Sequence, residues 1–176
     1  MDGRVICPHC STWNIAGVDT CAQCNQSLAD VQLTRKPQSR VEENLLRDRL
    51  QALGPVPPVV VGPDTPMCEV LDRLVTEEIG CVLVMRDEQL LGIFSERDAL
   101  LKLNADTAQL AERPVSEFMT PSVETLEFDD SIVFALHKMD LGGFRHIPLY
   151  RDGNVAGIVS VRDFLRYLVD DLIATT

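Results

Sequence analysis

The sequence has few aromatic residues, few basic residues and no long apolar run. Aromatic side chains make up 5% of the 176 residues, and 16 Lys and Arg face 27 Asp and Glu, which gives a net charge of −11. A strongly acidic chain repels the phosphates of nucleic acids and of anionic lipids, so we expect neither as a partner. Because a run of about eighteen apolar residues is lacking, we expect no membrane-spanning helix.

A secretory signal is also lacking. The first residues, MDGRVICPHC, have neither the basic start nor the apolar core that such a signal needs, so we expect a cytoplasmic protein. Disulfides are rare in that compartment, and the six cysteines therefore suggest metal binding or burial rather than a disulfide framework.

Four of the six cysteines form two Cys-x-x-Cys pairs. Cys7 pairs with Cys10, and Cys21 pairs with Cys24 after a gap of ten residues. Two such turns can place four thiolates around a tetrahedral zinc ion, at about 2.3 Å from each sulfur. The sequence therefore predicts a small zinc ribbon at residues 1–30. So short a segment cannot bury a sufficient core, and metal binding would supply its folding energy.

Other uses of these cysteines stay open. CPHC is similar to the redox motif of periplasmic thiol oxidases, although only six residues precede Cys7 and a second pair follows. Unliganded cysteines are the remaining alternative. We expect Trp13 to pack against the metal-binding turns, with contact to a partner as its alternative role.

Residues 31–54 connect the cysteine-rich segment to the rest of the chain. The stretch VQLTRKPQSR at 31–40 is polar, as is typical of a linker. Ser39 and Glu42 have the spacing of a capping box at the start of a helix. Apolar residues then recur at helical spacing, and we expect this helix to end at Gly54.

The remaining chain repeats itself. GIFSERD at 92–98 and GIVSVRD at 157–163 superpose without a gap when the chain is shifted by 65 residues. Each copy has a short β-prone run, an amphipathic helix, two strands joined by a turn, and a final helix. We place the copies at 55–118 and 119–176. The expected fold class is α+β, with tandem β-α-β-β-α repeats behind the small zinc ribbon.

Helix starts and stops can be proposed within the copies. Thr65 would cap the amphipathic helix of the first copy, and Pro66 would take its first position. In the second copy Asp129 or Asp130 would cap, and the helix would stop at Gly142-Gly143.

The tandem plan resembles the pair of cystathionine-β-synthase (CBS) domains called the Bateman module. The resemblance covers about residues 55–174 and rests on GIFSERD, GIVSVRD, FRHIPLY and VSEFMTPSVETL, together with the ungapped repeat. It implies a homodimer built from helices that face each other across the pair.

The Ser-x-x-Asp shared by the copies allows two interpretations. A Ser before a helix, with Asp three residues on, is an N-cap pattern that contributes on the order of 1 kcal/mol. Free amides at a helix N-terminus also bind phosphate, and a carboxylate there can accept from ribose hydroxyls. In the CBS family these positions contact adenosine nucleotides. The resemblance therefore implies Ser95 with Asp98, and Ser160 with Asp163, as nucleotide-binding sites.

The copies differ just before these sites. Arg145 and His146 precede Pro148 in the second copy, whereas the first copy has GCVL there. The resemblance implies that basic residues before this Pro face phosphate, with a structural role as the alternative for His146. We therefore expect a phosphorylated ligand at Ser160 and Asp163, and a degenerate site or an uncharged adenosyl ligand in the first copy.

Three classes of function follow. The leading hypothesis is a regulatory module in which AMP, ADP, ATP or S-adenosylmethionine shifts the relation of the copies, and the zinc ribbon passes the change to an unidentified protein partner. The alternative is a dimerising scaffold whose ribbon binds protein or nucleic acid without nucleotide control. An enzyme is disfavoured, because we find no Ser-His-Asp set and no P-loop, and because a four-cysteine zinc cannot activate water.

Overall fold

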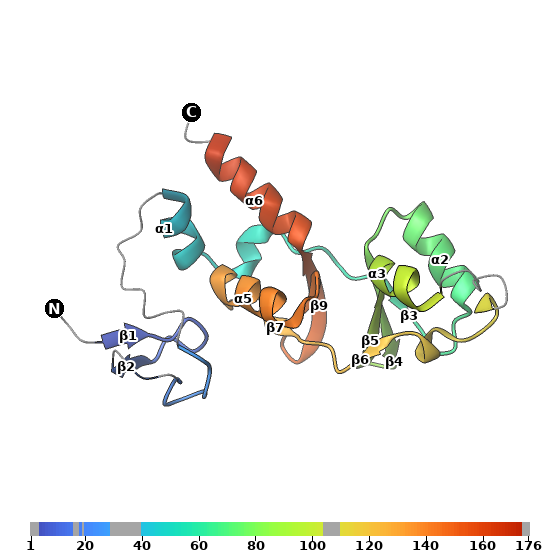
Figure 1. Cartoon of the computed structure of the whole chain (residues 1–176), viewed down its shortest axis with the longest axis horizontal. Coiled ribbons are helices and arrows are strands. Elements are labelled where there is room, and N and C mark those ends of the chain that lie inside the picture. The colour runs from blue at the N-terminus through green and yellow to red at the C-terminus, as the bar shows by residue number, and fades with distance from the viewer. Residues whose placement is uncertain (1–3, 16–17, 19, 29–39, 104–109, 174–176) are drawn as a thin grey trace. The chain divides into compact units, whose positions relative to one another are not determined.

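A computed structural model describes residues 4–15, 18, 20–28, 40–103 and 110–173 of the chain (Figure 1). The proposed helix cap Ser39 lies outside these residues. The chain divides into two compact units. One unit comprises Met1–Pro55, Glu127–Arg145 and Ser160–Thr176, and the other comprises Val56–Leu126 and His146–Val159.

A four-stranded sheet is built from the strands of the first copy, and its last strand comes from the start of the segment assigned to the second copy. Its strands are β3 (Val60–Val61), β4 (Cys81–Arg86), β5 (Gln89–Ser95) and β6 (Thr120–Pro121), in the order β3-β4-β5-β6. β3 runs parallel to β4, and the other neighbours are antiparallel. The first four side chains of β4 are all buried. They form a continuous apolar run, as expected for a strand that is covered on both faces.

The sheet carries an apolar core below helix α2 (Met67–Thr76). Its buried members are Val61, Met67, Val70, Leu74, Val82, Val84, Phe94, Leu103, Val115 and Phe118. After β5 come a single turn, α3 (Glu96–Asp98), a π-helical turn (Ala99–Leu103) and later a 3-10 turn (Val115–Glu117).

The second copy repeats these elements at the predicted interval. β8 (His146–Arg151), β9 (Asn154–Ser160) and α5 (Ile132–Gly142) each begin 65 residues after β4, β5 and α2. With β7 (Leu126–Glu127) the strands form a sheet in the order β7-β8-β9, and α6 (Val161–Ile173) follows β9. The tight turns also match, since Asp87 and Asp152 have φ angles of 55° and 52°.

The helix predicted to end at Gly54 is broken into two. α1 (Arg40–Arg47) is followed by a 3-10 turn at Leu50–Leu53, and Gly54 ends that turn with a φ of 64°, as expected. The break has a physical reason. The amides of Leu50 and Gln51 donate to the carbonyls of Asp130 and Phe128, at 2.9 and 3.0 Å, rather than to the preceding helical turn.

The predicted cap of α2 is wrong. Pro66, not Thr65, is the N-cap residue, and it accepts no side-chain bond. The amide of Met67 instead donates to the carbonyl of Arg113 at 2.9 Å, so a distant loop satisfies this helix end.

The predicted cap of α5 is also wrong. Ser131 takes that role, and its Oγ accepts from the amide of Phe134 at 3.1 Å. Asp130 is instead used outside the helix, where its Oδ2 accepts from the amide of Glu127 at 2.8 Å. Gly143 ends α5 in the left-handed region, as predicted.

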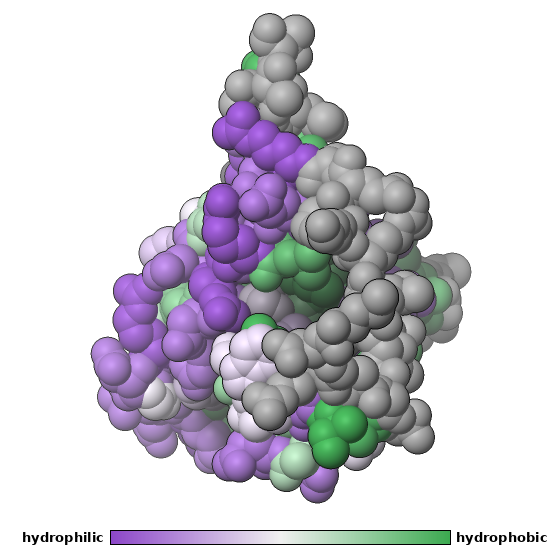
Figure 2. Space-filling view, turned by 90° about the vertical axis from the view of Figure 1, so that its left-hand side faces the viewer, coloured by the Kyte–Doolittle hydropathy of each residue, from purple (hydrophilic) through white to green (hydrophobic). Residues whose placement is uncertain are grey.

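In the view of Figure 2, the described residues are largely hydrophilic, with smaller apolar patches between them. Among the residues that the structure describes, no helix has the length and apolarity needed to cross a membrane.

Candidate nucleotide and metal sites

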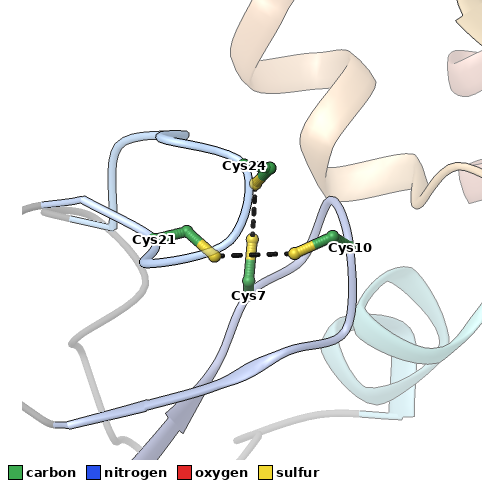
Figure 3. A group of neighbouring side chains, drawn as sticks. All are labelled: Cys7, Cys10, Cys21 and Cys24. Atoms are coloured by element: carbon green, nitrogen blue, oxygen red, sulfur yellow. Dashed lines mark hydrogen bonds between the residues drawn. The ribbon is translucent and has the colours of Figure 1, made fainter.

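The four N-terminal cysteines converge on one point (Figure 3). Cys7 lies on the turn after β1 (Arg4–Ile6), and β2 (Trp13–Ile15) leads on to the second pair. The sulfurs all lie within 4.8 Å of one another, with 3.6 Å from Cys7 to Cys24 and 3.5 Å from Cys10 to Cys21. Sulfurs bound to one tetrahedral zinc ion are about 3.8 Å apart, so the four thiols fit this metal.

Hydrogen bonds favour the thiolate form of Cys21. The buried Asn14 donates to Cys21 Sγ at 3.5 Å, and the amide of Gln23 lies 3.4 Å from the same sulfur. Burial acts to raise the pKa of Cys21, but the amides of Cys24 and Gln23, together with Asn14, lower it to about 6. One thiolate is therefore favoured at neutral pH, and a metal ion would favour deprotonation of the other thiols.

Trp13 does not pack against the metal-binding turns, contrary to expectation. It is 61% exposed, because it lies on the same open face of β2 as the exposed Ile15, while Asn14 between them points inward. Contact with a partner, the alternative role for Trp13, stays a prediction.

Ser95 and Asp98 form a complete helix cap where β5 meets α3. The amide and Oγ of Ser95 donate to Asp98 Oδ2 at 3.0 and 2.5 Å, and the amide of Asp98 lies 3.3 Å from Ser95 Oγ. The capping interpretation is therefore confirmed for the first copy.

The second oxygen of Asp98 is occupied as well. Lys102 Nζ lies 2.7 Å from Asp98 Oδ1, and Thr120 Oγ1 donates to it at 2.9 Å. Lys102 also donates to the carbonyl of Phe118 at 2.7 Å. Burial acts to raise the pKa of Asp98, but the hydrogen bonds from Lys102, Ser95 and Thr120 outweigh it and lower the pKa. Ribose hydroxyls would have to compete with these donors.

The second copy repeats the Ser–Asp contact, and its carboxylate is about as exposed as that of Asp98, at 18% against 15%. The amide and Oγ of Ser160 both donate to Asp163 Oδ2 at 2.7 Å. Asp163 Oδ1 pairs with Arg166 Nη1 at 3.2 Å, and the Arg166 side chain is 68% exposed. An exposed guanidinium is easier to displace than Lys102, which also donates to the carbonyl of Phe118 and to Thr120 Oγ1.

A cavity of about 300 Å³ opens beside Asp163. This volume is at the lower end of the range for small-molecule sites. Asp163, Arg166, Tyr167 and Asp170 line it from α6, and Asn44 and Asp48 line it from the N-terminal helical segment. The side chain of Tyr167 donates to Asp48 Oδ2 at 2.6 Å. The lining thus holds three carboxylates and one guanidinium.

The nucleotide-binding candidates before Ser160 lie in different surroundings: Arg145 and His146, which were predicted to face phosphate, and Pro148. Arg145 is exposed, and its carbonyl accepts from the amide of Val161, the residue after Ser160, at 3.0 Å. Pro148 is buried within β8. The backbone hydrogen bond from Val161 places Arg145 next to the junction at Ser160.

His146 lies against the first copy. A Cβ added to Gly80 would lie only 2.6 Å from His146 Nε2. The carbonyl of Gly80 accepts from the amide of Glu96, at the start of α3, at 3.1 Å. The imidazole is therefore next to the first junction, whereas the sequence had suggested a role at its own copy's junction. The only signal for this in the sequence is the small residue at position 80.

Known proteins share this arrangement. The family model of the CBS domain matches residues 53–105 and 115–170. A CBS domain-containing protein of Arabidopsis thaliana is 32% identical over 102 residues, which are 57% of this chain but only 19% of that protein.

Solved structures agree in fold. A CBS-domain containing protein from Agrobacterium tumefaciens has a TM-score of 0.64 and 31% identity, covering 68% of this chain and 98% of its own. A CBS domain protein from Pyrobaculum aerophilum, complexed with AMP, has a TM-score of 0.59 and 25% identity over 73% of this chain and 100% of its own. The two copies therefore form a CBS pair of mixed α and β structure, and the chain belongs to the CBS-domain family.

Proposed function

We propose that this chain is a non-catalytic regulatory module. Its CBS pair binds an adenosine ligand at Asp163, and its N-terminal zinc ribbon contacts a protein partner. The observation that carries the proposal is the Asp163 carboxylate at the edge of a cavity of about 300 Å³. The relative from Pyrobaculum aerophilum that was solved with AMP supports this ligand class.

The second copy provides the better site. Asp163 Oδ2 is held by Ser160, which orients the carboxylate, while Oδ1 can exchange Arg166 for a ribose hydroxyl. Once displaced, the exposed Arg166 can pair with a ligand phosphate, and Arg145 at the same junction is available for the same role.

The charge of the cavity favours ligands with few negative charges. Asp48, Asp163 and Asp170 face one guanidinium, so each added phosphate increases the repulsion between ligand and lining. We expect AMP or S-adenosylmethionine to bind more tightly than ADP, and ADP more tightly than ATP.

The first site is proposed to be weaker. Asp98 has both oxygens occupied, and Lys102 and Thr120 would have to be displaced before a ribose could bind. The imidazole of His146 beside Gly80 is the group that could meet a ligand at this junction.

A homodimer is proposed from α6. Apolar side chains recur along this helix at every fourth residue and are 36% to 68% exposed; they are Val161, Leu165, Val169 and Ile173. An amphipathic helix with such a stripe normally packs against another element, and a second copy of the chain is a suitable partner.

The scaffold without nucleotide control is the second candidate. The closed capping box at Ser95 and Asp98 favours it, because this geometry explains both residues without any ligand.

Isothermal titration calorimetry with AMP, ADP, ATP and S-adenosylmethionine tests these candidates. Asp163→Asn should abolish binding in a folded protein, and Asp98→Asn, the matched variant of the other copy, should leave most of it. If no compound binds the wild type at millimolar concentration, the scaffold is the better description.

A further inference from the structure

We infer that the first metal-binding turn docks on the start of α5 through His9, so that the metal state of the ribbon is coupled to the second CBS repeat. This inference rests on the proposed zinc site. It concerns His9 of the CPHC turn, whose ring reaches Asp130 and Phe134 of the repeat.

His9 makes two contacts with the repeat. Its Nδ1 lies 3.5 Å from Asp130 Oδ1. Its ring is tilted by 44° against that of Phe134, with 4.6 Å between the ring centroids. Distances and angles of this kind are typical of a favourable aromatic pair.

Asp130 holds several segments together at this point. Its Oδ2 accepts from the amide of Glu127 at 2.8 Å, and its carbonyl accepts from the amide of Leu50 at 2.9 Å. The residue is buried, and His9 faces its other carboxylate oxygen. A displacement of His9 would therefore change the environment of Asp130. Through Asp130 it would affect the start of α5 and the 3-10 turn that begins with Leu50.

The internal repeat supplies a comparison. The residues 65 positions earlier are Thr65 for Asp130 and Glu69 for Phe134. Glu69 is exposed on α2, whereas Phe134 is 2% exposed on α5. The two copies thus differ at the position that the ribbon contacts. The first copy has a surface carboxylate there, and the second copy has a covered aromatic ring. This difference indicates that α5 is adapted to a covering group.

The ribbon supplies a second comparison. Gln23 occupies in the Cys21–Cys24 turn the place that His9 occupies in the Cys7–Cys10 turn, and its side chain is exposed. The two turns have the same metal-binding spacing, but only the first presents a ring to α5 among the described residues. Gln23→Ala is therefore the matched control for His9→Ala.

The coupling works in both directions by linkage. Thiolate coordination fixes the turn that carries His9, so zinc favours the docked ring, and docking in turn favours the metal-bound turn. Loss of zinc releases the turn, removes the cover of Phe134 and leaves Asp130 Oδ1 without the imidazole.

Zinc transfer from the full-length, zinc-loaded protein to a chromogenic chelator tests this coupling. His9→Ala and Phe134→Leu should each speed zinc release about two- to tenfold, the range that one aromatic contact supports. Because both variants remove the same contact, the double variant should release zinc no faster than the faster single variant. Gln23→Ala and Glu69→Ala should release zinc at the wild-type rate.

NMR spectroscopy observes the ring contact directly and separates its loss from misfolding of a variant. In the zinc-loaded wild type, nuclear Overhauser contacts are expected between the rings of His9 and Phe134. Zinc removal should shift the amide resonance of Phe134 in the wild type and leave it unchanged in His9→Ala. Absence of the ring contact, or wild-type release from His9→Ala with one zinc bound per chain, overturns the inference alone. Failure to bind zinc at all overturns the metal site and the inference together.

Discussion

Asp98 and Lys102 form an ion pair with 2.7 Å between Oδ1 and Nζ, whereas Asp163 is followed at the same interval by Tyr167. Tyr167 turns to Asp48 instead, at 2.6 Å. A repeat that is ungapped over its motifs therefore contains two different sites: a carboxylate held by Lys102 and Thr120, and a carboxylate that pairs with the exposed Arg166 and faces a cavity. The predictions below test the consequences.

Lys102→Met should raise the pKa of Asp98 toward its ordinary value, because the variant removes the strongest of the hydrogen bonds that lower it. A carboxylate with a lowered pKa stabilises the folded state above its unfolded pKa of about 3.9, and this stabilisation is lost as the pH falls through the lower folded value. The variant should thus be less stable at pH 7 by roughly 0.5–1 kcal/mol, with a smaller difference at pH 2. Urea unfolding at both pH values measures this; an equal loss at both would contradict it.

Tyr167→Phe should destabilise the protein by about 1 kcal/mol and raise the pKa of Asp48, because the hydroxyl of Tyr167 is the largest influence that lowers this pKa. Carboxyl carbon shifts followed by NMR during an acid titration report the change. Tyr150→Phe is the control, since Tyr150 belongs to β8 and is not among the residues that line the cavity with Asp48. An unshifted Asp48 would show that the contact is not formed in solution.

Cys21→Ser should reduce the zinc content of the purified protein well below one ion per chain. Cys21 is the sulfur whose pKa is lowered to about 6, and a hydroxyl in its place does not bind as an anion. Cys68→Ser is the control, because Cys68 is exposed and lies outside the cluster. Elemental analysis after dialysis decides, and equal zinc content in the two variants would exclude a four-cysteine site.

Leu165→Glu should convert a dimer into a monomer. The side chain lies in the exposed apolar stripe of α6, and a buried unpaired carboxylate there would cost several kcal/mol. Analytical ultracentrifugation compares it with Ile15→Glu, which alters a still more exposed apolar residue of the ribbon, at 72% against 57% for Leu165. A monomeric wild type, or a variant that still dimerises, would remove α6 from the interface.

Gly80→Ala should destabilise the protein by about 0.5–1.5 kcal/mol, because the new Cβ would lie 2.6 Å from His146 Nε2 and the ring would have to rotate away from its rotamer. The double variant with His146→Ala should recover most of that loss, since the clash disappears with the ring. Thermal unfolding of the four proteins completes the cycle. Additive losses would mean that the imidazole does not lie on Gly80.

Much of the fold could be predicted from local pattern. The start of β8 after β4, and of β9 after β5, follows from the 65-residue shift, because the alternation of apolar residues and the turn chemistry act within one copy. The Ser–Asp contacts at Ser95 and Ser160 are similarly local, since each joins residues three positions apart. The convergence of the four cysteines was indicated by their spacing alone.

Contacts between distant segments decided the rest. Thr65 is not a cap because the carbonyl of Arg113 reaches the start of α2, and the N-terminal helix breaks because Asp130 accepts from the amide of Leu50. Likewise, the sequence places Lys102 and His146 on their elements, but only the tertiary structure brings Lys102 onto Asp98 and His146 onto Gly80. Such pairings depend on which distant chain segments come together in the fold. The secondary-structure preferences of a short stretch of sequence do not determine them.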